Sequence, residues 1–182
     1  AREAGVKGVI YSASSSVYGD QKWRLLSEDL HPFPKNPYAL HKLMSEQLCR
    51  QFTDLYHLPT VCLRYFNVYG ERQVTEGAYA TVIGIFLRQK AKGEPLTIVG
   101  DGEQRRDFTY VADVVQANIS AMEHVSGLAR QVINIGTGTN YSVNEVADII
   151  EGDQLKPNRV NLPSRPGEVR ETLADITKAR KL

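Results

Sequence analysis

The chain has 182 residues, of which 42% are hydrophobic and 24% are charged, and its formal net charge is +1. This composition is that of one ordinary soluble domain, and a charge so close to neutral provides no field that would recruit nucleic acid or an anionic membrane. No apolar run reaches the about 18 residues that a membrane span needs, and no signal-peptide pattern opens the sequence. We therefore expect neither a nucleic-acid partner nor a membrane partner.

The cysteines and histidines give no sign of a disulfide framework or a metal site. Cys49 and Cys62 both lie in apolar segments of a chain without a secretion signal. Two such residues are most simply reduced thiols of the core, which favours a cytoplasmic location. The four histidines lack metal-ligand spacing, so no bound metal is expected; they are His31, His41, His57 and His124.

The first third of the chain predicts a helix end, a strand and a long helix. Residues 1–5 resemble the last turn of a helix closed by Gly5, and residues 7–12 form a short apolar run typical of a buried strand. A helix is predicted over residues 37–57, with Asn36 as its N-cap and Pro37 at its first position. Apolar residues recur in it at helical spacing and predict one buried stripe: Leu40, Leu43, Met44, Leu48, Phe52 and Leu55.

The remainder alternates between strands and helices. Ser142 and Glu145 predict a capping box that opens a helix over residues 142–151. The sequence Gly-Thr-Gly at 136–138 lacks the third glycine of a dinucleotide fingerprint, so we interpret it as a tight turn, with phosphate binding as a minority alternative. The other expected elements are strands 60–66, 96–99 and 132–135 and helices 78–92 and 112–124. This alternation predicts an α/β fold whose ligands bind at the carboxyl ends of parallel strands.

A tyrosine and a lysine of the predicted helix 37–57 indicate a site for proton transfer. Tyr38 and Lys42 are four residues apart on the predicted helix, which puts both side chains on one face, downstream of a serine cluster at 12–16. An ammonium beside a phenol stabilises the phenolate, and a serine hydroxyl from the preceding strand can bond the same substrate oxygen. Such a pair often lies on a surface helix by chance, but its place after a strand and a serine-rich turn favours a proton-transfer site that serves a nicotinamide cofactor.

Six segments of the sequence carry a resemblance to a known family. In chain order they are SASSSVYG (12–19), PYALHK (37–42), LRYFNVYG (63–70), GDGEQRRDFTYVADV (100–114), NIGTG (134–138) and RPGEVRETLAD (165–175). Together they resemble the extended short-chain dehydrogenase/reductase family, in its nucleotide-sugar epimerase/dehydratase branch, and the resemblance covers nearly all of the chain. It implies the carboxyl-terminal part of a Rossmann-type doubly wound parallel sheet plus a smaller α/β substrate-binding domain. Residues 1–73 are expected to hold late Rossmann elements, and residues 74–182 mainly the substrate domain, with some elements returning to the sheet.

The resemblance implies roles on the catalytic side. Tyr38 is the general base, Lys42 activates it and holds the nicotinamide ribose, and Ser14 is the catalytic hydroxyl, with Ser15 as its rival. The cofactor is NAD, and Tyr65 and Phe66 belong to the segment that flanks the nicotinamide and the sugar. The cofactor-binding residues implied are Ser12, Tyr38, Lys42 and Tyr65.

The resemblance also implies a nucleotide-sugar site. Arg106 and Arg165 grip the diphosphate, which suits the bidentate geometry of guanidinium groups, and Glu168 contacts the ribose. Strand 96–99 lines the base, normally uracil, and a small Thr172 leaves room for an N-acetyl group. The substrate-binding residues implied are Ser14, Ser15, Asn67, Leu96, Thr97, Val99, Arg106, Arg165, Glu168 and Thr172.

The implied activity is NAD-dependent epimerisation at C4 of a UDP-hexose or UDP-N-acetylhexosamine through a 4-keto intermediate. Ser15 and Ser16 stand where the family's dehydratases and decarboxylases carry acids, which favours epimerisation over a dehydratase or reductase of the same superfamily. The family's G-x-x-G-x-x-G loop does not occur in the sequence. The chain is therefore expected to be an internal piece of such an enzyme, and a nucleotide-sugar-binding module without turnover is the alternative. A homodimer through helices 37–57 and 78–92 is implied, although a monomer's core would give the same pattern.

Overall fold

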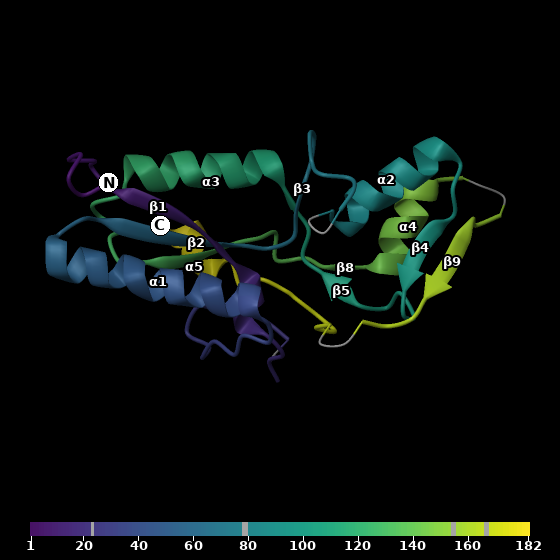
Figure 1. Ribbon diagram of the computed structural model, residues 1–182, viewed down its shortest axis with the longest axis horizontal. Helices are drawn as coiled ribbons and strands as arrows, with labels where there is room; N and C mark the ends of the chain where they lie inside the picture. The colour runs from purple at the N-terminus through teal and green to yellow at the C-terminus, as the bar shows by residue number, and fades with distance from the viewer. Residues whose placement is uncertain (23, 78–79, 154–155, 166–167) are drawn as a thin grey trace.

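The computed structural model describes residues 1–22, 24–77, 80–153, 156–165 and 168–182. Half of the molecule is built on a parallel sheet with the strand order β1-β2-β7, and helices α1 and α3 cover its two faces (Figure 1). Helix α5 packs against β7. These elements are β1 (Val9–Ser14), β2 (Thr60–Tyr65), β7 (Val132–Ile135), α1 (Pro37–Tyr56), α3 (Val111–Glu123) and α5 (Thr177–Lys181).

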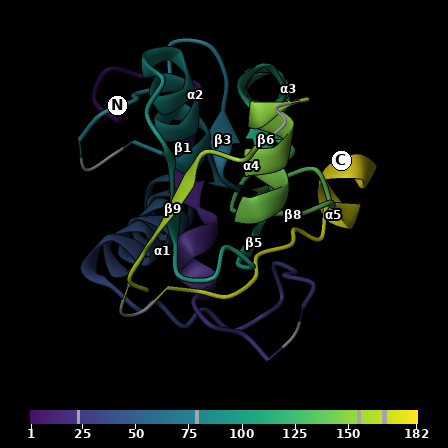
Figure 2. The same cartoon turned by 90° about the vertical axis from the view of Figure 1, so that its right-hand side faces the viewer.

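The other half, which faces the viewer in Figure 2, consists of two helices packed on each other and on a pair of parallel strands. Its core contains Phe86, Leu96, Ile98, Val146 and Ala147. Two short strand pairs, β3 with β6 and β5 with β8, lie between the halves. The elements are α2 (Val82–Lys92), α4 (Val143–Glu151), β4 (Leu96–Val99), β9 (Arg159–Leu162), β3 (Val68–Tyr69), β6 (Thr109–Tyr110), β5 (Arg105–Arg106) and β8 (Tyr141–Ser142).

Local chemistry explains where the helices begin. The Asn36 side chain accepts a hydrogen bond from the backbone N–H of Ala39 at 2.9 Å, so this residue caps α1 as predicted. Both reciprocal bonds of the predicted capping box are present between Ser142 and Glu145, at 3.0 and 2.6 Å. The predicted boundaries of α3, β4 and β7 agree with the structure to within one residue.

Three local predictions are wrong. Residues 1–5 form hydrogen-bonded turns and not a helix end, with the N–H of Gly5 bonded to the carbonyl of Arg2 at 3.0 Å. Strand β1 begins at Val9, two residues later than predicted, because its pairing with β2 starts opposite Thr60. Helix α2 begins at Val82, four residues after its predicted start at 78, and residues 78–79 lie outside the described residues.

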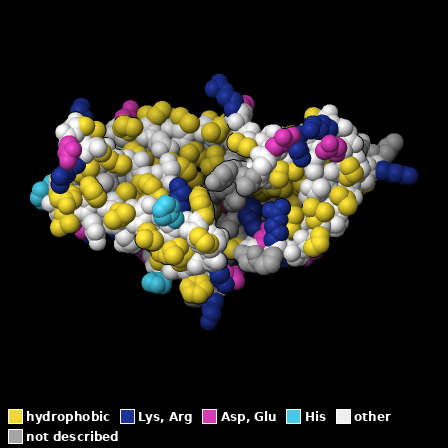
Figure 3. Space-filling view, viewed as in Figure 1, with side chains coloured by type: hydrophobic (Ala, Val, Ile, Leu, Met, Phe, Trp, Pro, Cys, Tyr) yellow, Lys and Arg dark blue, Asp and Glu magenta, His cyan; other side chains and the backbone are white. Residues whose placement is uncertain are grey.

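The predicted buried stripe of α1 is also wrong. Five of its six residues are 41 to 67% exposed, and only Leu43 packs against the core; the exposed ones are Leu40, Met44, Leu48, Phe52 and Leu55. The face turned to the sheet contains instead Ala39, Glu46 and Cys49. Glu46 can lie on this buried face because its charge is paired with Arg64 of β2. The apolar stripe of the helix faces outward (Figure 3).

Among the described residues, no helix is long and apolar enough to cross a membrane, and no three His, Cys, Asp or Glu side chains are grouped for a metal. Helix α3, strand β7 and helix α5 lie after residue 73 in the sequence but belong to the half built on the β1-β2-β7 sheet. The division of the chain at residue 73 stays a prediction.

Candidate functional site

A cleft opens at the carboxyl ends of β1 and β2, between the two halves of the molecule. The parallel register puts Ser14 opposite Tyr65 at this edge. The part of the cleft beside the sheet is lined by Ser12–Ser16, Tyr38, Lys42, Tyr65 and Thr172, among others. It joins a second pocket, beside α2 and β4, through shared lining residues, and basic side chains gather in the hollow between the halves (Figure 3). The shared residues are Asn67, Thr81, Arg106 and Glu168.

Tyr38 and Lys42 lie together on the wall of this cleft. The Nζ atom of Lys42 is 5.7 Å from the centroid of the Tyr38 ring and donates a hydrogen bond of 2.7 Å to the carbonyl of Ser12. The Tyr38 side chain is 55% exposed, so its phenol is accessible to a ligand. The helix thus presents a phenol and a cation to the same space, which is the arrangement that proton abstraction from an alcohol requires.

Ser14 ends β1 and caps the short 3-10 helix at 15–18. Its Oγ accepts a hydrogen bond from the backbone N–H of Ser16 at 3.2 Å. Because a backbone N–H can only donate, the hydroxyl proton of Ser14 remains available for an acceptor in the cleft. Ser15 lines the same wall. The buried Oγ of Ser16 has no hydrogen-bond partner within the described part of the chain.

Tyr65 takes part in a chain of hydrogen bonds whose directions can be assigned. The amide nitrogen of Asn118 donates to the Val114 carbonyl at 2.7 Å, so its amide oxygen faces Tyr65 and accepts the phenol proton at 2.9 Å. The remaining contact, 3.2 Å between Tyr65 and the hydroxyl of Ser12, must then be donated by Ser12. Ser12 therefore offers lone pairs to a ligand. Asn118 was not predicted, because an asparagine on a helix face carries no sequence signal.

Asn67 links the two halves at the middle of the cleft. Its amide nitrogen donates to the Asp107 carbonyl at 3.1 Å and to the Thr172 hydroxyl at 3.3 Å, which leaves its amide oxygen without a protein donor among the described residues. Phe66, the preceding residue, is fully buried against Tyr18, with ring centroids 6.2 Å apart. The prediction that Phe66 flanks the ligands is therefore wrong: alternation along the strand turns it into the core.

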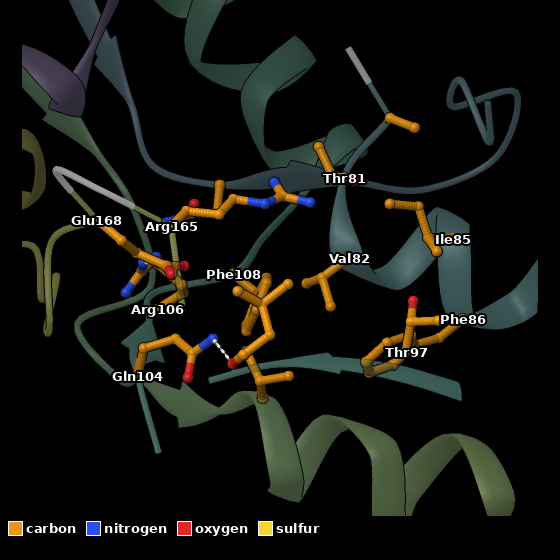
Figure 4. Close-up of a pocket in the computed structure, with 14 residues that line it drawn as sticks. Thr81, Val82, Ile85, Phe86, Thr97, Gln104, Arg106, Phe108, Arg165 and Glu168 are labelled. Atoms are coloured by element: carbon orange, nitrogen blue, oxygen red, sulfur yellow. Dashed lines mark hydrogen bonds and ion pairs between the residues drawn. The ribbon is translucent and has the colours of Figure 1, made fainter. Parts of the chain in front are cut away.

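Arg106 is a largely enclosed cation of the cleft, with its side chain 15% exposed and 3.3 Å from the carboxylate of Glu168. Burial, the largest effect, holds the pKa of Arg106 below its usual value, and Glu168 opposes this shift. An enclosed guanidinium with one weak counter-charge gains from a further anion. Arg165 lies on the same side and extends across the pocket towards Thr81 (Figure 4).

Strand β4 forms the far wall. Thr97 and Val99 line the pocket, with Phe86 and Phe108 nearby (Figure 4). Leu96 does not: it is 2% exposed and packs with Phe86 and Ile98 in the core. The prediction of a ligand contact by Leu96 is wrong, because successive side chains of a strand point to opposite faces.

The Gly-Thr-Gly turn binds an internal carboxylate. Asp107 is fully buried and accepts bonds of 2.9 and 2.8 Å from the N–H and hydroxyl of Thr137, 3.0 Å from the N–H of Gly138 and 3.2 Å from the N–H of Ala174. These backbone donors are thereby occupied. The observed geometry supports the tight-turn interpretation and gives no free anion site at 136–138.

Residues 1–136 match the family described as "Epimerase: NAD dependent epimerase/dehydratase family". The chain belongs to this family. It is 39% identical over 178 residues to a "Putative UDP-glucose 4-epimerase" of Methanocaldococcus jannaschii, covering 97% of this chain and 56% of that protein. It is also 36% identical over 191 residues to a "UDP-N-acetyl-alpha-D-glucosaminuronate decarboxylase" of Bacillus cytotoxicus, covering 98% and 58%.

Solved structures of family members share the fold. The UDP-N-acetylglucosamine 4-epimerase of Methanobrevibacter ruminantium, in complex with UDP-N-acetylmuramic acid, is 38% identical with a TM-score of 0.89, covering 99% of this chain and 57% of that one. The UDP-glucuronic acid 4-epimerase of Bacillus cereus, in complex with UDP-glucuronic acid and NAD, is 38% identical with a TM-score of 0.87, covering 95% and 54%. The chain has a Rossmann-type α/β fold and spans a little over half the length of these relatives.

The family is NAD-dependent, and the residues at the sheet end of the cleft fit a nicotinamide. Ser12 offers lone pairs that suit a carboxamide N–H, and Lys42 offers a cation for ribose hydroxyls. The sequence contains no G-x-x-G-x-x-G segment, the usual loop for the pyrophosphate of a dinucleotide.

Proposed function

We propose that this chain carries the proton-transfer residues and the nucleotide-sugar site of an enzyme that epimerises C4 of a UDP-hexose or a UDP-N-acetylhexosamine. The observation that carries the proposal is one continuous cleft with Tyr38, Lys42 and Ser14 at one end and Arg106 and Arg165 at the other. A phenol beside a cation suits alcohol chemistry, and paired guanidinium groups suit a diphosphate. The names of the relatives agree with this combination.

The proposed mechanism assigns a step to each group. The Tyr38 phenolate, stabilised by Lys42, takes the proton of the sugar's 4-hydroxyl, while the Ser14 hydroxyl donates a hydrogen bond to the same oxygen. NAD+, when bound, supplies the hydride acceptor that this alcohol oxidation requires. Arg106, with Arg165 and Asn67, holds the diphosphate while the 4-keto sugar turns. Return of the hydride to the opposite face of C4, from the cofactor reduced in the first step, together with return of the proton by Tyr38, would restore the 4-hydroxyl with inverted configuration.

The free edge of β4 supports a uracil base. Leu96 donates its N–H to the carbonyl of Asn158, just before β9, and Gly100 donates its N–H to Leu162 of β9, at 2.8 Å each. The alternating register therefore turns the backbone groups of Thr97 and Val99 to the other edge. Two of these four groups are satisfied, since Gln89 accepts from the Thr97 N–H and Gln104 donates to the Val99 carbonyl. Among the described residues the Thr97 carbonyl and the Val99 N–H have no partner, and this acceptor beside a donor complements the N–H and carbonyl of an imide.

The substrate sugar depends on Thr172 in this proposal. Its side chain is small and lines the sheet end of the cleft, held by Asn67, and leaves room for an N-acetyl group. Activity on UDP-hexoses but not on UDP-N-acetylhexosamines would refute the proposal that the pocket has room for an N-acetyl group. The decarboxylase relative keeps a dehydratase or decarboxylase as the alternative, but Ser15 and Ser16 provide no acid at the cleft.

We also propose a homodimer through the outward stripe of α1. Leu48 and its neighbours form an exposed apolar face that a second copy would cover. If so, Leu48→Lys lowers the mass measured by sedimentation equilibrium to that of one chain; an unchanged mass contradicts the proposal. The free thiols of Cys49 and Cys62 support a reducing compartment, and we propose the cytoplasm.

The test is proton NMR of the chain with UDP-N-acetylglucosamine and NAD+, following the anomeric signals and saturation transfer to the ligand. An epimer signal supports the full activity. Saturation transfer from the UDP protons without turnover supports the alternative function, a nucleotide-sugar-binding part of a larger enzyme. Absence of both refutes the nucleotide-sugar site.

A further inference from the structure

Tyr11 of strand β1 lies on the face of the sheet that helix α1 covers. Side chains alternate along the strand, so Tyr11 and Ala13 belong to the core on this side, whereas the Ser12 hydroxyl contacts Tyr65 on the other. Tyr11 is half-buried, and its own hydroxyl makes no hydrogen bond among the described residues. Its ring faces a cation instead, because the Nζ atom of Lys42 lies 5.2 Å from the ring centroid.

The Lys42 ammonium is held by groups that carry no formal charge. It donates a hydrogen bond of 2.7 Å to the Ser12 carbonyl, and its Nζ lies near the rings of Tyr11 and Tyr38, at 5.2 and 5.7 Å from their centroids. Within the described part of the chain it makes no ion pair with a carboxylate. The face of an aromatic ring is negative and attracts a cation at such a distance.

A second cation on the same face of the sheet is held differently. The Arg64 guanidinium lies 4.7 Å from the centroid of the Tyr18 ring, but it also pairs with the Glu46 carboxylate at 2.7 Å, which compensates its charge. The charge of Lys42 is not compensated in this way. A carboxylate in place of the Tyr11 ring would hold Lys42 equally well but would oppose its effect on a nearby phenol.

We propose that Tyr11 is a positioning residue of the proton-transfer pair, whose ring holds the Lys42 ammonium beside Tyr38 without neutralising it. This inference rests on the proposed role of Tyr38 as the base and adds to it the residue that keeps the activating charge in place. The Ser12 carbonyl takes one of the three N–H groups of Lys42, and a ring face takes no particular one, so N–H groups stay available to ligand hydroxyls. Without the ring, the flexible lysine stem is free to turn towards solvent.

Nitration by tetranitromethane tests the inference, because this reagent attacks a phenolate much faster than a neutral phenol. The chain is treated without ligand at mildly alkaline pH, and peptide mapping gives the rate at Tyr38 relative to Tyr141, an exposed tyrosine of β8. Tyr11→Leu is expected to lower this ratio by about two- to fivefold, the effect of one cation–π contact near the surface, and Tyr11→Phe to retain it. Tyr56→Leu is the matched control: it removes a ring 4.4 Å from Arg2 at the other end of α1 and is expected to change nothing.

Two further variants separate charge from packing. Lys42→Met removes the charge itself and is expected to lower the rate at Tyr38 at least as much as Tyr11→Leu. A 4-cyanophenylalanine at position 11 keeps a ring of similar size but withdraws negative charge from its face. It is expected to lower the rate too, and it serves as the test if circular dichroism shows that Tyr11→Leu does not fold.

The outcomes are distinguishable. A lower rate with leucine and with the cyano ring, together with an unchanged rate in Tyr11→Phe, supports the inference. If neither change at position 11 affects the rate while Lys42→Met lowers it, the inference is overturned and the proton-transfer pair stands. Equal losses in Tyr11→Phe and Tyr11→Leu overturn it as well, since the ring face would then not matter. A rate unaffected by Lys42→Met refutes the coupling of Lys42 to Tyr38 on which the proposed function itself depends.

Discussion

Replacing Glu46 by Gln tests what holds the helix of Tyr38 and Lys42 on the sheet. Glu46 is 1% and Arg64 is 3% exposed, and they share two hydrogen bonds of 2.9 and 2.7 Å. The Arg64 guanidinium also lies 4.7 Å from the centroid of the Tyr18 ring. Burial, the largest effect, acts to lower the pKa of Arg64, but the bonds to Glu46 and the Tyr18 contact reverse this, and the pKa lies above its usual value.

The magnitude follows from this enclosure. Removing one partner of a buried ion pair leaves an uncompensated charge and typically costs about 3–5 kcal/mol. The Nη1 atom of Arg64 already lacks a partner within the described residues, so no alternative bond in the surroundings offsets the loss. We therefore expect Glu46→Gln to lower the free energy of unfolding by about 3 kcal/mol or more. The double variant Glu46→Leu, Arg64→Met is expected to recover most of it, since apolar replacement of a whole buried pair is often neutral.

Urea unfolding followed by circular dichroism measures the change. Asp54 provides a matched control on the same helix, because it pairs with Arg130 at 2.9 Å but both side chains are about half exposed. Asp54→Asn is expected to cost no more than about 1 kcal/mol, as surface pairs do. A cost for Glu46→Gln no greater than that of Asp54→Asn would show that the buried pair does not anchor α1.

Three further outcomes are expected. Burial raises the pKa of Tyr18 to about 12 in the folded protein, whereas a tyrosine in the unfolded chain has a pKa of about 10. The neutral phenol therefore stabilises the folded state fully below pH 10, and about 3 kcal/mol of folding stability is lost as the pH rises from 10 to 12. In Tyr18→Phe the free energy of unfolding should therefore fall less steeply with pH between 10 and 12 than in the unmodified chain. An unchanged slope of stability against pH contradicts this prediction. Tyr38→Phe is expected to abolish any epimer formation in the NMR assay while leaving UDP affinity within about twofold; weaker UDP binding counts against its role as base. Arg106→Ala is expected to weaken UDP binding in titration calorimetry by about tenfold or more, with exposed Arg130→Ala unchanged, and equal affinities would remove Arg106 from the diphosphate site.

The sequence predicted those features that local chemistry decides. The caps at Asn36 and Ser142 follow from short polar side chains that accept the free N–H groups of the first helical turn, and the short strands follow from apolar runs between turns. The outward stripe of α1 was mispredicted, since periodicity shows that one face is apolar but not which partner covers it. Only the pairing of Glu46 with Arg64, 18 residues apart, shows which face meets the sheet.

For the site, most of the residues taken from the motifs line the cleft, but Leu96 and Phe66 do not, and motif order did not predict how the side chains are oriented. Thr97 and Val99 could be separated from Leu96 only by the phase of the strand, which its register with β9 fixes. The roles of Gln89 and Asn118 depend on hydrogen bonds made after the chain has folded. Glutamine and asparagine on helices are ordinary surface residues, so neither carried a signal in the sequence.

Asp107→Asn tests the junction on which the cleft depends. The carboxylate accepts four hydrogen bonds, two at each oxygen, while its backbone N–H bonds the Thr172 carbonyl at 3.1 Å and its carbonyl accepts from Asn67. With its NH2 group at the Oδ2 position, an asparagine faces the N–H groups of Gly138 and Ala174 and loses both bonds. With the NH2 group at the Oδ1 position it loses the bond from the Thr137 N–H, while the Thr137 hydroxyl can turn and accept. We expect a loss of about 3 kcal/mol in urea unfolding and weaker UDP binding, because Thr172 and the neighbouring Arg106 lose their support.

Asp20→Asn is the control, since this exposed aspartate lies 3.8 Å from Lys35 and is expected to change stability by less than about 1 kcal/mol. Equal effects of the two variants would mean that the turn at 136–138 does not need an internal anion. In that case its N–H groups would be available to a phosphate after all. A large, selective loss for Asp107→Asn would instead support the assignment of the turn to Asp107, since an added phosphate could bind there only by displacing a buried carboxylate from four donors.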